Sequence, residues 1–94
     1  MDRIEIKTKS GFEAVIDPAA LDDMELLDAL SDLDEGKATS YKYAISALLG
    51  EDQRKALYEH VRDKKTGRVS AKKVFTGFAE ILNAAKENPG VKNS

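Results

Sequence analysis

The segment IEIKTKSGFEAVI, residues Ile4–Ile16, decides how this chain begins to fold. Apolar and polar residues alternate on both sides of Ser10-Gly11, which is the pattern of strands with one buried face. Glycine permits a positive φ in a tight turn, so the segment predicts a β-hairpin that turns at Ser10-Gly11. An isolated hairpin is only marginally stable in water, so this one must dock on other elements.

Helical periodicity follows the hairpin. Asp17-Pro18 ends the second strand and predicts a short turn over Pro18–Leu21. A first helix is expected over Asp22–Glu35, with Asp22 as N-cap in a capping box with Glu25 and Gly36 as its stop. The pattern predicts three more helices: one capped by Thr39 or Ser40 and interrupted at Gly50, one over Glu51–Asp63, and one from Ser70 to Asn88-Pro89-Gly90.

Length and composition agree with one domain. The chain has 94 residues, of which 41% are hydrophobic and 34% charged, enough apolar content for a core. The prediction is therefore a small α+β domain, mostly helical, with an N-terminal β-hairpin followed by about four helices. It covers residues 1–88, and residues 89–94 are expected to form a flexible tail.

The residue types argue against catalysis and against a bound metal. Cysteine is absent and His60 is the one histidine, so the usual zinc ligands cannot be assembled. A calcium loop centred on Gly36 fails because Lys42 stands where a bidentate glutamate is needed. No phosphate-binding glycine motif and no nucleophile–base set is present. We expect no enzyme activity, no cofactor, no membrane span and a cytoplasmic protein.

Charge is divided unevenly along the chain. Residues 1–36 carry 11 acidic and 3 basic side chains, whereas residues 37–94 carry 6 acidic and 12 basic ones. Four acids recur at spacings of three, four and three on the expected first helix, opposite its leucine face: Glu25, Asp28, Asp32 and Glu35. This acidic stripe is a candidate surface for a basic partner or a second copy, and the alternative is a solvated face.

A second charged feature surrounds the expected turn before the last helix. This basic cluster comprises Arg62, Lys64, Lys65, Arg68, Lys72 and Lys73. The cluster could contact phosphates, but no aromatic residues interleave with it for base stacking, and the whole chain carries a net charge of −2. A nucleic-acid interface is therefore less favoured than a solvated loop or a protein contact.

The order of these segments resembles a known family. The hairpin ends in Ile16-Asp17, and the acidic Asp22–Asp28 segment and Leu33-Asp34-Glu35-Gly36 come next. The remaining matching segments are Leu48–Gln53, His60–Asp63 and Gly67–Ser70. Over about residues 4–85 this arrangement is similar to the tail assembly chaperones of long, non-contractile-tailed bacteriophages and prophages of Gram-positive hosts. The similarity lies in segment order and not in one diagnostic motif.

The resemblance implies a non-enzymatic role. Such chaperones bind the tape-measure protein, a long helical chain, and keep it soluble until the tail tube assembles around it. They act in the cytoplasm of the infected or lysogenic host and are absent from the mature virion. Self-association along the client is also expected. Two alternatives stay open: a small protein-binding adaptor or regulatory module, and a nucleic-acid binder that uses Arg62–Lys73.

Overall fold

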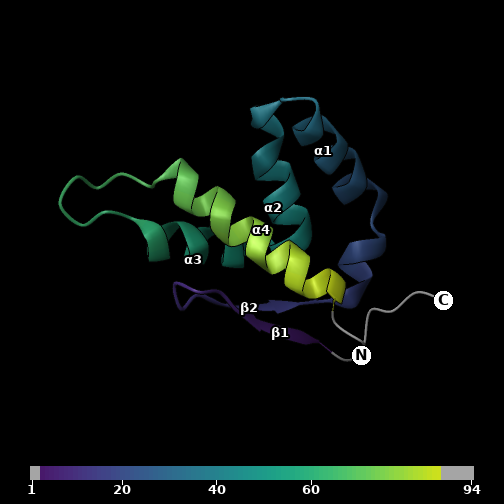
Figure 1. Ribbon diagram of the computed structural model, residues 1–94, viewed down its shortest axis with the longest axis horizontal. Coiled ribbons are helices and arrows are strands. Elements are labelled where there is room, and N and C mark those ends of the chain that lie inside the picture. Colours follow the sequence, from purple (N-terminus) through teal and green to yellow (C-terminus); the bar gives the residue numbers. More distant parts are fainter. Residues whose placement is uncertain (1–2, 88–94) are drawn as a thin grey trace.

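A two-stranded antiparallel hairpin opens the fold, as Figure 1 shows for the computed structural model, which describes residues 3–87. Strand β1 (Ile4–Lys7) pairs with β2 (Glu13–Ile16), with Ile4 opposite Ile16. The connection turns at Gly11, whose φ of 97° requires glycine, and the Thr8 amide donates to the Phe12 carbonyl at 2.8 Å. The predicted hairpin and its turn are confirmed.

The first helix starts two residues later than predicted. Asp17 caps a short 3-10 helix over Pro18–Asp22, so Asp22 ends that element and caps nothing. The N-cap is Asp23, which is extended and accepts a hydrogen bond from the Glu25 amide at 2.8 Å. Helix α1 (Met24–Asp34) therefore has no capping box, because Glu25 lies one position too early for that motif.

Gly36 ends α1 as predicted. Its φ is 87°, and the amides of Gly36 and Lys37 donate to the carbonyls of Leu33 and Asp32. This is the hydrogen-bond pattern of a Schellman motif, which satisfies the last carbonyls of a helix.

Helix α2 (Tyr41–Leu49) follows a 3-10 turn over Ala38–Ser40. Ser40 precedes the helix as predicted, but its hydroxyl makes no cap. It donates instead to the Asp32 carboxylate at 2.9 Å, which ties the start of α2 to the end of α1. Side-chain capping was therefore the wrong role for Ser40.

Helix α3 (Glu51–Val61) begins after Gly50, whose φ is 83°. It ends two residues earlier than predicted, because Arg62 is extended and forms a β-bridge with Val69. Residues 62–70 make a projecting loop (Figure 1). Helix α4 (Ala71–Glu87) starts after Ser70, whose hydroxyl accepts from the Lys73 amide as predicted for an N-cap.

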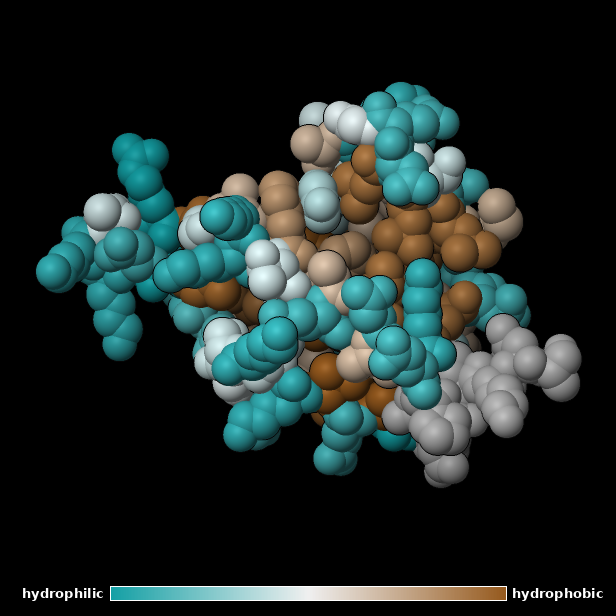
Figure 2. Space-filling model, in the orientation of Figure 1, coloured by the Kyte–Doolittle hydropathy of each residue, from teal (hydrophilic) through white to brown (hydrophobic). Residues whose placement is uncertain are grey.

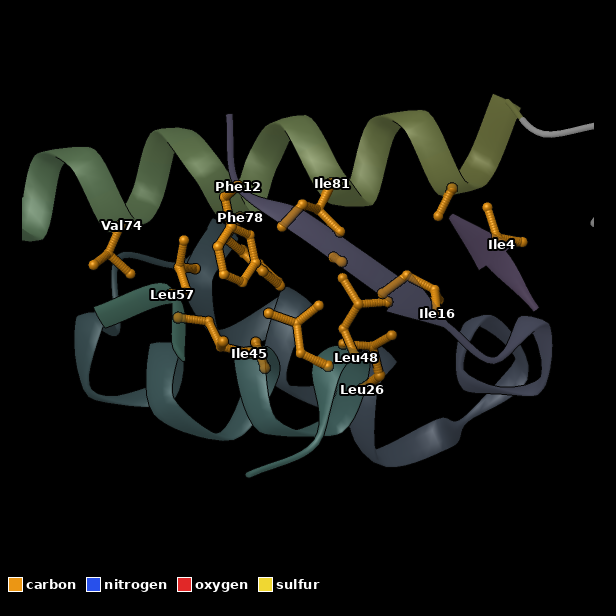
Figure 3. Packing of buried hydrophobic residues seen from close by; sticks show 14 of the residues in the cluster. Ile4, Phe12, Ile16, Leu26, Ile45, Leu48, Leu57, Val74, Phe78 and Ile81 are labelled. Carbon is orange, nitrogen blue, oxygen red and sulfur yellow. The ribbon is translucent and has the colours of Figure 1, made fainter. Parts of the chain in front are cut away.

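One core joins all these elements, and Figure 3 shows α4 on one side of it and β2 and the other helices around the rest. The hairpin contributes Ile4 and Ile16, and α1 and α3 contribute Leu26 and Leu57. The other buried apolar side chains are Phe12, Ala14, Ala29, Ala44, Ile45, Leu48, Leu49, Val74, Phe78, Ile81 and Ala85. The chain is thus a small α+β, mostly helical domain; the predicted tail 89–94 lies outside the described residues.

Candidate partner-binding surfaces

The acidic stripe lies on α1 and at its C-terminal end. Glu25 and Asp28 are exposed, and within residues 3–87 neither carboxylate forms an ion pair or side-chain hydrogen bond. Asp32 is half-buried, and Glu35 has left the helix to become its C-cap residue. The structure therefore keeps the four residues in sequence along one side, but it divides them into two kinds.

The C-terminal half of the stripe is paired within the chain. Lys37 places its ammonium 3.3 Å from the Glu35 carboxylate and 3.8 Å from Asp32, which also accepts the Ser40 hydrogen bond. These cations and donors offset the repulsion between acids at the negative end of the helix dipole. Among the four stripe residues, Glu25 and Asp28 are thus the two whose charges have no partner within residues 3–87.

The basic cluster is also divided by its contacts. Arg62 is held by the Glu59 carboxylate, with its Nε 3.0 Å from Oε1, and by the Gly67 carbonyl at 2.6 Å. The Arg62 guanidinium holds the pKa of Glu59 below its usual range through this hydrogen bond. Arg62 thus fixes the projecting loop and is not free to bind a phosphate.

Three further basic residues lie within the projecting loop. Lys64, Lys65 and Arg68 are exposed there, and Figure 2 shows this end of the molecule covered by hydrophilic side chains. Asp63 organises the turn, because its carboxylate accepts from the backbone amides of Lys65 and Thr66. The loop therefore has a defined backbone and a cationic surface.

Lys72 and Lys73 lie on the first turn of α4, where they line the same groove as Arg62 of the loop. The groove, of about 670 Å³, lies between α3 and α4 and is bordered by His60, Asp63 and Glu80. His60 is exposed, and its Nε2 lies 3.1 Å from the Ser10 hydroxyl. This polar groove carries charges of both signs.

A different groove, of about 480 Å³, lies between α1 and α4. We call it the apolar groove because most of its lining residues are apolar, although polar and apolar atoms share its exposed surface about equally. Leu27 on α1 is 46% exposed beside it, and Phe75 and Leu82 line it from α4. The other lining residues are Leu30, Ser31, Leu33, Asp34, Tyr41, Phe78, Ala79, Asn83 and Lys86. Figure 2 shows hydrophobic surface over α1 on this side of the molecule.

Aromatic rings form the floor of the apolar groove. Tyr41 stacks on Phe75 with ring centroids 3.7 Å apart and an interplanar angle of 14°. Phe78 meets Tyr41 edge to face at 6.3 Å. Because offset and edge-to-face aromatic pairs hold defined geometries, this floor is a preformed apolar surface.

The acidic stripe and the apolar groove are on different sides of α1. None of the four stripe residues is among the described residues that line the groove. The helix pattern did not predict this groove, because Leu27 falls outside the 3–4 spacing of the face formed by Leu26, Ala29, Leu30 and Leu33. The available signal was the pair Met24 and Leu27, two apolar residues off the core face of an otherwise polar helix surface.

The titratable groups with shifted pKa values belong to ion pairs. Arg54 is buried and donates to Glu51 at 2.8 Å, which lowers the pKa of Glu51 to about 2, with a further contribution from Ser46. A carboxylate this acidic is a poor general base at neutral pH. Within residues 3–87, no group of three or more histidine, aspartate or glutamate side chains is placed to hold a metal ion.

None of the helices in the described part of the chain has both the length and the apolar character needed to cross a bilayer. No family model, no curated protein and no solved structure matches this chain.

Proposed function

We propose that this chain is a non-enzymatic tail assembly chaperone that binds the tape-measure protein of a bacteriophage or prophage and prevents its aggregation before tail assembly. The observation that carries the proposal is the apolar groove between α1 and α4. The sequence resemblance supplies the kind of client, and the groove supplies a surface that suits a helical one.

The apolar residues that line the groove suit one face of an amphipathic helix. Such helices bind in grooves through apolar side chains that recur every three or four residues. Leu27 on α1 and Leu82 on α4 offer aliphatic contacts on the two walls, and Phe75 lies on the floor, stacked on Tyr41. A client helix seated there would bury the apolar stripe that otherwise drives aggregation.

A shallow groove of this size gives weak binding at each site, which suits a chaperone that must later leave its client. Several copies bound along one long chain would be held by multivalency. In this proposal Glu25 and Asp28 act at longer range, because unpaired acids on an exposed helix attract a basic client and raise its association rate.

The test is co-expression with the tape-measure protein encoded beside this chain, followed by tagged pull-down and light scattering. We expect Leu27→Asp to lose most of the solubilising effect, since replacing a buried leucine contact costs about 1.5–3 kcal/mol per site, or roughly ten- to hundredfold in affinity. Met24→Asp is the matched control. Met24 is also apolar, lies on α1 and is 63% exposed, but it does not line the groove.

Equal loss in both variants would show that the groove is not the binding surface. A client that stays insoluble with the wild-type chain as well would reject the chaperone proposal for this form. The double variant Glu25→Lys/Asp28→Lys examines the acidic stripe separately. Client capture that is unchanged at low ionic strength would remove the stripe from the proposal.

Two other functions give different results in the same experiments. An adaptor or regulatory module would form a stoichiometric complex with a compact partner and would not solubilise a long helical one. A nucleic-acid binder would use the exposed Lys64, Lys65 and Arg68 of the projecting loop, and its affinity would fall steeply with salt.

A further inference from the structure

A two-stranded sheet has two outer edges, and the register determines which backbone groups face them. In an antiparallel pair, hydrogen-bonded residue pairs alternate with pairs whose amides and carbonyls point outward. Thr8 and Phe12 are a hydrogen-bonded pair, so Ile6–Ala14 and Ile4–Ile16 are as well. The residues between them direct their backbone groups away from the partner strand.

At Val15, the outer edge of β2 is occupied by a side chain. The Val15 amide donates to Gln53 Oε1 at 2.7 Å, and Gln53 Nε2 donates to the Val15 carbonyl at 2.8 Å. The carboxamide of Gln53 thus makes both hydrogen bonds that a neighbouring strand would make. Gln53 is itself held on α3 by a second bond from Nε2 to the Leu49 carbonyl.

Within residues 3–87, nothing pairs with the outer edge of β1 along Glu5 and Lys7. By the same alternation, the amides and carbonyls of Glu5 and Lys7 face outward, and both residues are exposed. Further along, the Lys9 amide donates to Glu80 of α4 at 2.9 Å, which ends the open stretch. Figure 1 shows β1 along one rim of the molecule, with no helix drawn beyond it.

We infer that a second copy of this chain pairs with β1 along this edge, in an antiparallel register centred on Ile6. The contact would form a four-stranded sheet in the order β2–β1–β1–β2. Glu5 of each copy then lies opposite Lys7 of the other. The amide and carbonyl of both residues are satisfied in both copies, by four hydrogen bonds between the chains.

Charge selects this register. On the solvent face, Lys7 already lies opposite Glu13 within the hairpin, so the row across the four strands reads Glu13, Lys7, Glu5, Val15 and alternates in sign. A register centred on Glu5 would oppose Glu5 to itself and Arg3 to Lys7. Opposite charges across strands are favourable and like charges are not.

Ile6 distinguishes the two remaining charge-matched alignments. A register centred on Ile4 pairs Arg3 with Glu5, but it leaves Lys7 without an opposing acid. Ile4 is already buried, whereas Ile6 is the half-exposed apolar residue of β1. Centring on Ile6 brings its two copies together and removes that remaining apolar surface from water.

The association is weak because the strand edge is short. Four residues per strand bury far less than the roughly 1,000 Å² of a stable interface. The pair is therefore a concentration-dependent dimer related by a two-fold axis. This inference rests on the strand edge alone and does not depend on the proposed chaperone function.

The experiment combines sedimentation velocity with residue-resolved amide hydrogen exchange of the wild-type chain over a wide range of protein concentration. We expect the mass to rise toward that of a dimer, and the amides of Glu5 and Lys7 to become protected together with it. Exposed amides at concentrations where the mass has doubled would place the contact elsewhere. A chain that stays monomeric throughout would overturn the inference.

Charge variants test the register. Glu5→Lys places a lysine opposite Lys7 of the other copy, at two positions in each dimer. It should weaken dimerisation roughly tenfold or more. The triple variant Glu5→Lys/Lys7→Glu/Glu13→Lys has the same net charge as Glu5→Lys, but it keeps every cross-strand pair with its sign reversed. We expect it to restore the wild-type dimerisation. Equal weakening in both variants, or protection of Arg3 in place of Lys7, would reject the register centred on Ile6.

Discussion

Helix α4 has two flanks of opposite character. Toward α1 it presents Phe75 and Leu82 to an apolar groove with an aromatic floor. Toward α3 it presents Lys72, Lys73 and Glu80 to a polar groove that is somewhat larger. The two grooves thus differ in the residue types that line them, which are mostly apolar toward α1 and mostly charged or polar toward α3.

The comparison teaches that the distribution of charge in the sequence does not locate the surface best suited to a helical client. The acidic stripe and the basic cluster are conspicuous in the sequence, yet Asp32, Glu35 and Arg62 are engaged within the fold. The apolar groove has no conspicuous motif. It exists because α1 packs on α2 while α4 packs on α3 and β1, which leaves a channel between α1 and α4.

Removing the side chain that lies behind the apolar flank should have the largest effect. Phe78 is 3% exposed and contributes both to the core and to the groove floor. We expect Phe78→Ala to lower the free energy of unfolding by about 3–5 kcal/mol, because it leaves a cavity. Urea denaturation measures the loss. Tyr43→Ala is the control, since Tyr43 is 73% exposed and should change stability by less than about 0.5 kcal/mol.

On the polar flank, Gly77 tests how closely α3 and α4 approach. A Cβ added there would lie 3.4 Å from Leu57 Cδ1, which is an ordinary contact distance. Alanine is favoured over glycine inside a helix by about 0.8–1 kcal/mol, so Gly77→Ala should raise the melting temperature. A clear destabilisation would show instead that α3 and α4 can pack this closely only when residue 77 has no side chain.

Lys73 tests whether the charge of the polar flank serves the fold. Ser70 caps α4 and accepts from the Lys73 amide, so Lys73→Glu completes a capping box and places an acid at the positive end of the helix dipole. We expect stabilisation of about 0.3–1 kcal/mol in thermal unfolding at low salt. Lys86→Glu, the same change at the other end of α4, should destabilise the chain, and equal effects would refute the dipole explanation.

Lowering the pH should destabilise the fold through the Glu51–Arg54 ion pair on α3 and not through the apolar flank of α4. The pKa of Glu51 is lowered to about 2 by Arg54, from an ordinary value of 4.5. The stabilisation from this pair is therefore complete above about pH 4.5 and is lost as the pH falls toward 2. Melting temperatures across this range should fall less steeply for Glu51→Gln than for wild type. Parallel curves would show that other carboxylates account for the acid sensitivity.

Local pattern was sufficient for most of the fold. Alternation in Ile4–Ile16 identified the strands, and helical periodicity with start and stop residues identified the helices. The wrong predictions concern helix ends, where a neighbouring residue or an alternative hydrogen bond replaced the predicted one. Asp23 took the capping role from Asp22, Ser40 bonded Asp32 and not its own helix, and Arg62 left α3 to bridge Val69.

The candidate surfaces were harder to predict because they depend on contacts between distant segments. Leu27 faces a groove only because α4 lies across from α1, and no spacing within α1 contains that information. In the same way, the closure of β2 joins Val15 to a residue 38 positions away. Charge patterns are read directly from a sequence, but the partners that neutralise them appear only after folding.

Gln53 limits the number of copies of this chain that can associate through their strand edges. In the proposed dimer, pairing through the outer edge of β1 stops at two copies, because each copy uses this edge to bind the other. Loss of the Gln53 carboxamide would expose the Val15 amide and carbonyl as a second edge on the same sheet. Every added copy would then leave a further edge available, which is the condition for open-ended polymerisation. The side-chain amide of Gln53 would therefore prevent further copies from adding to the sheet at β2.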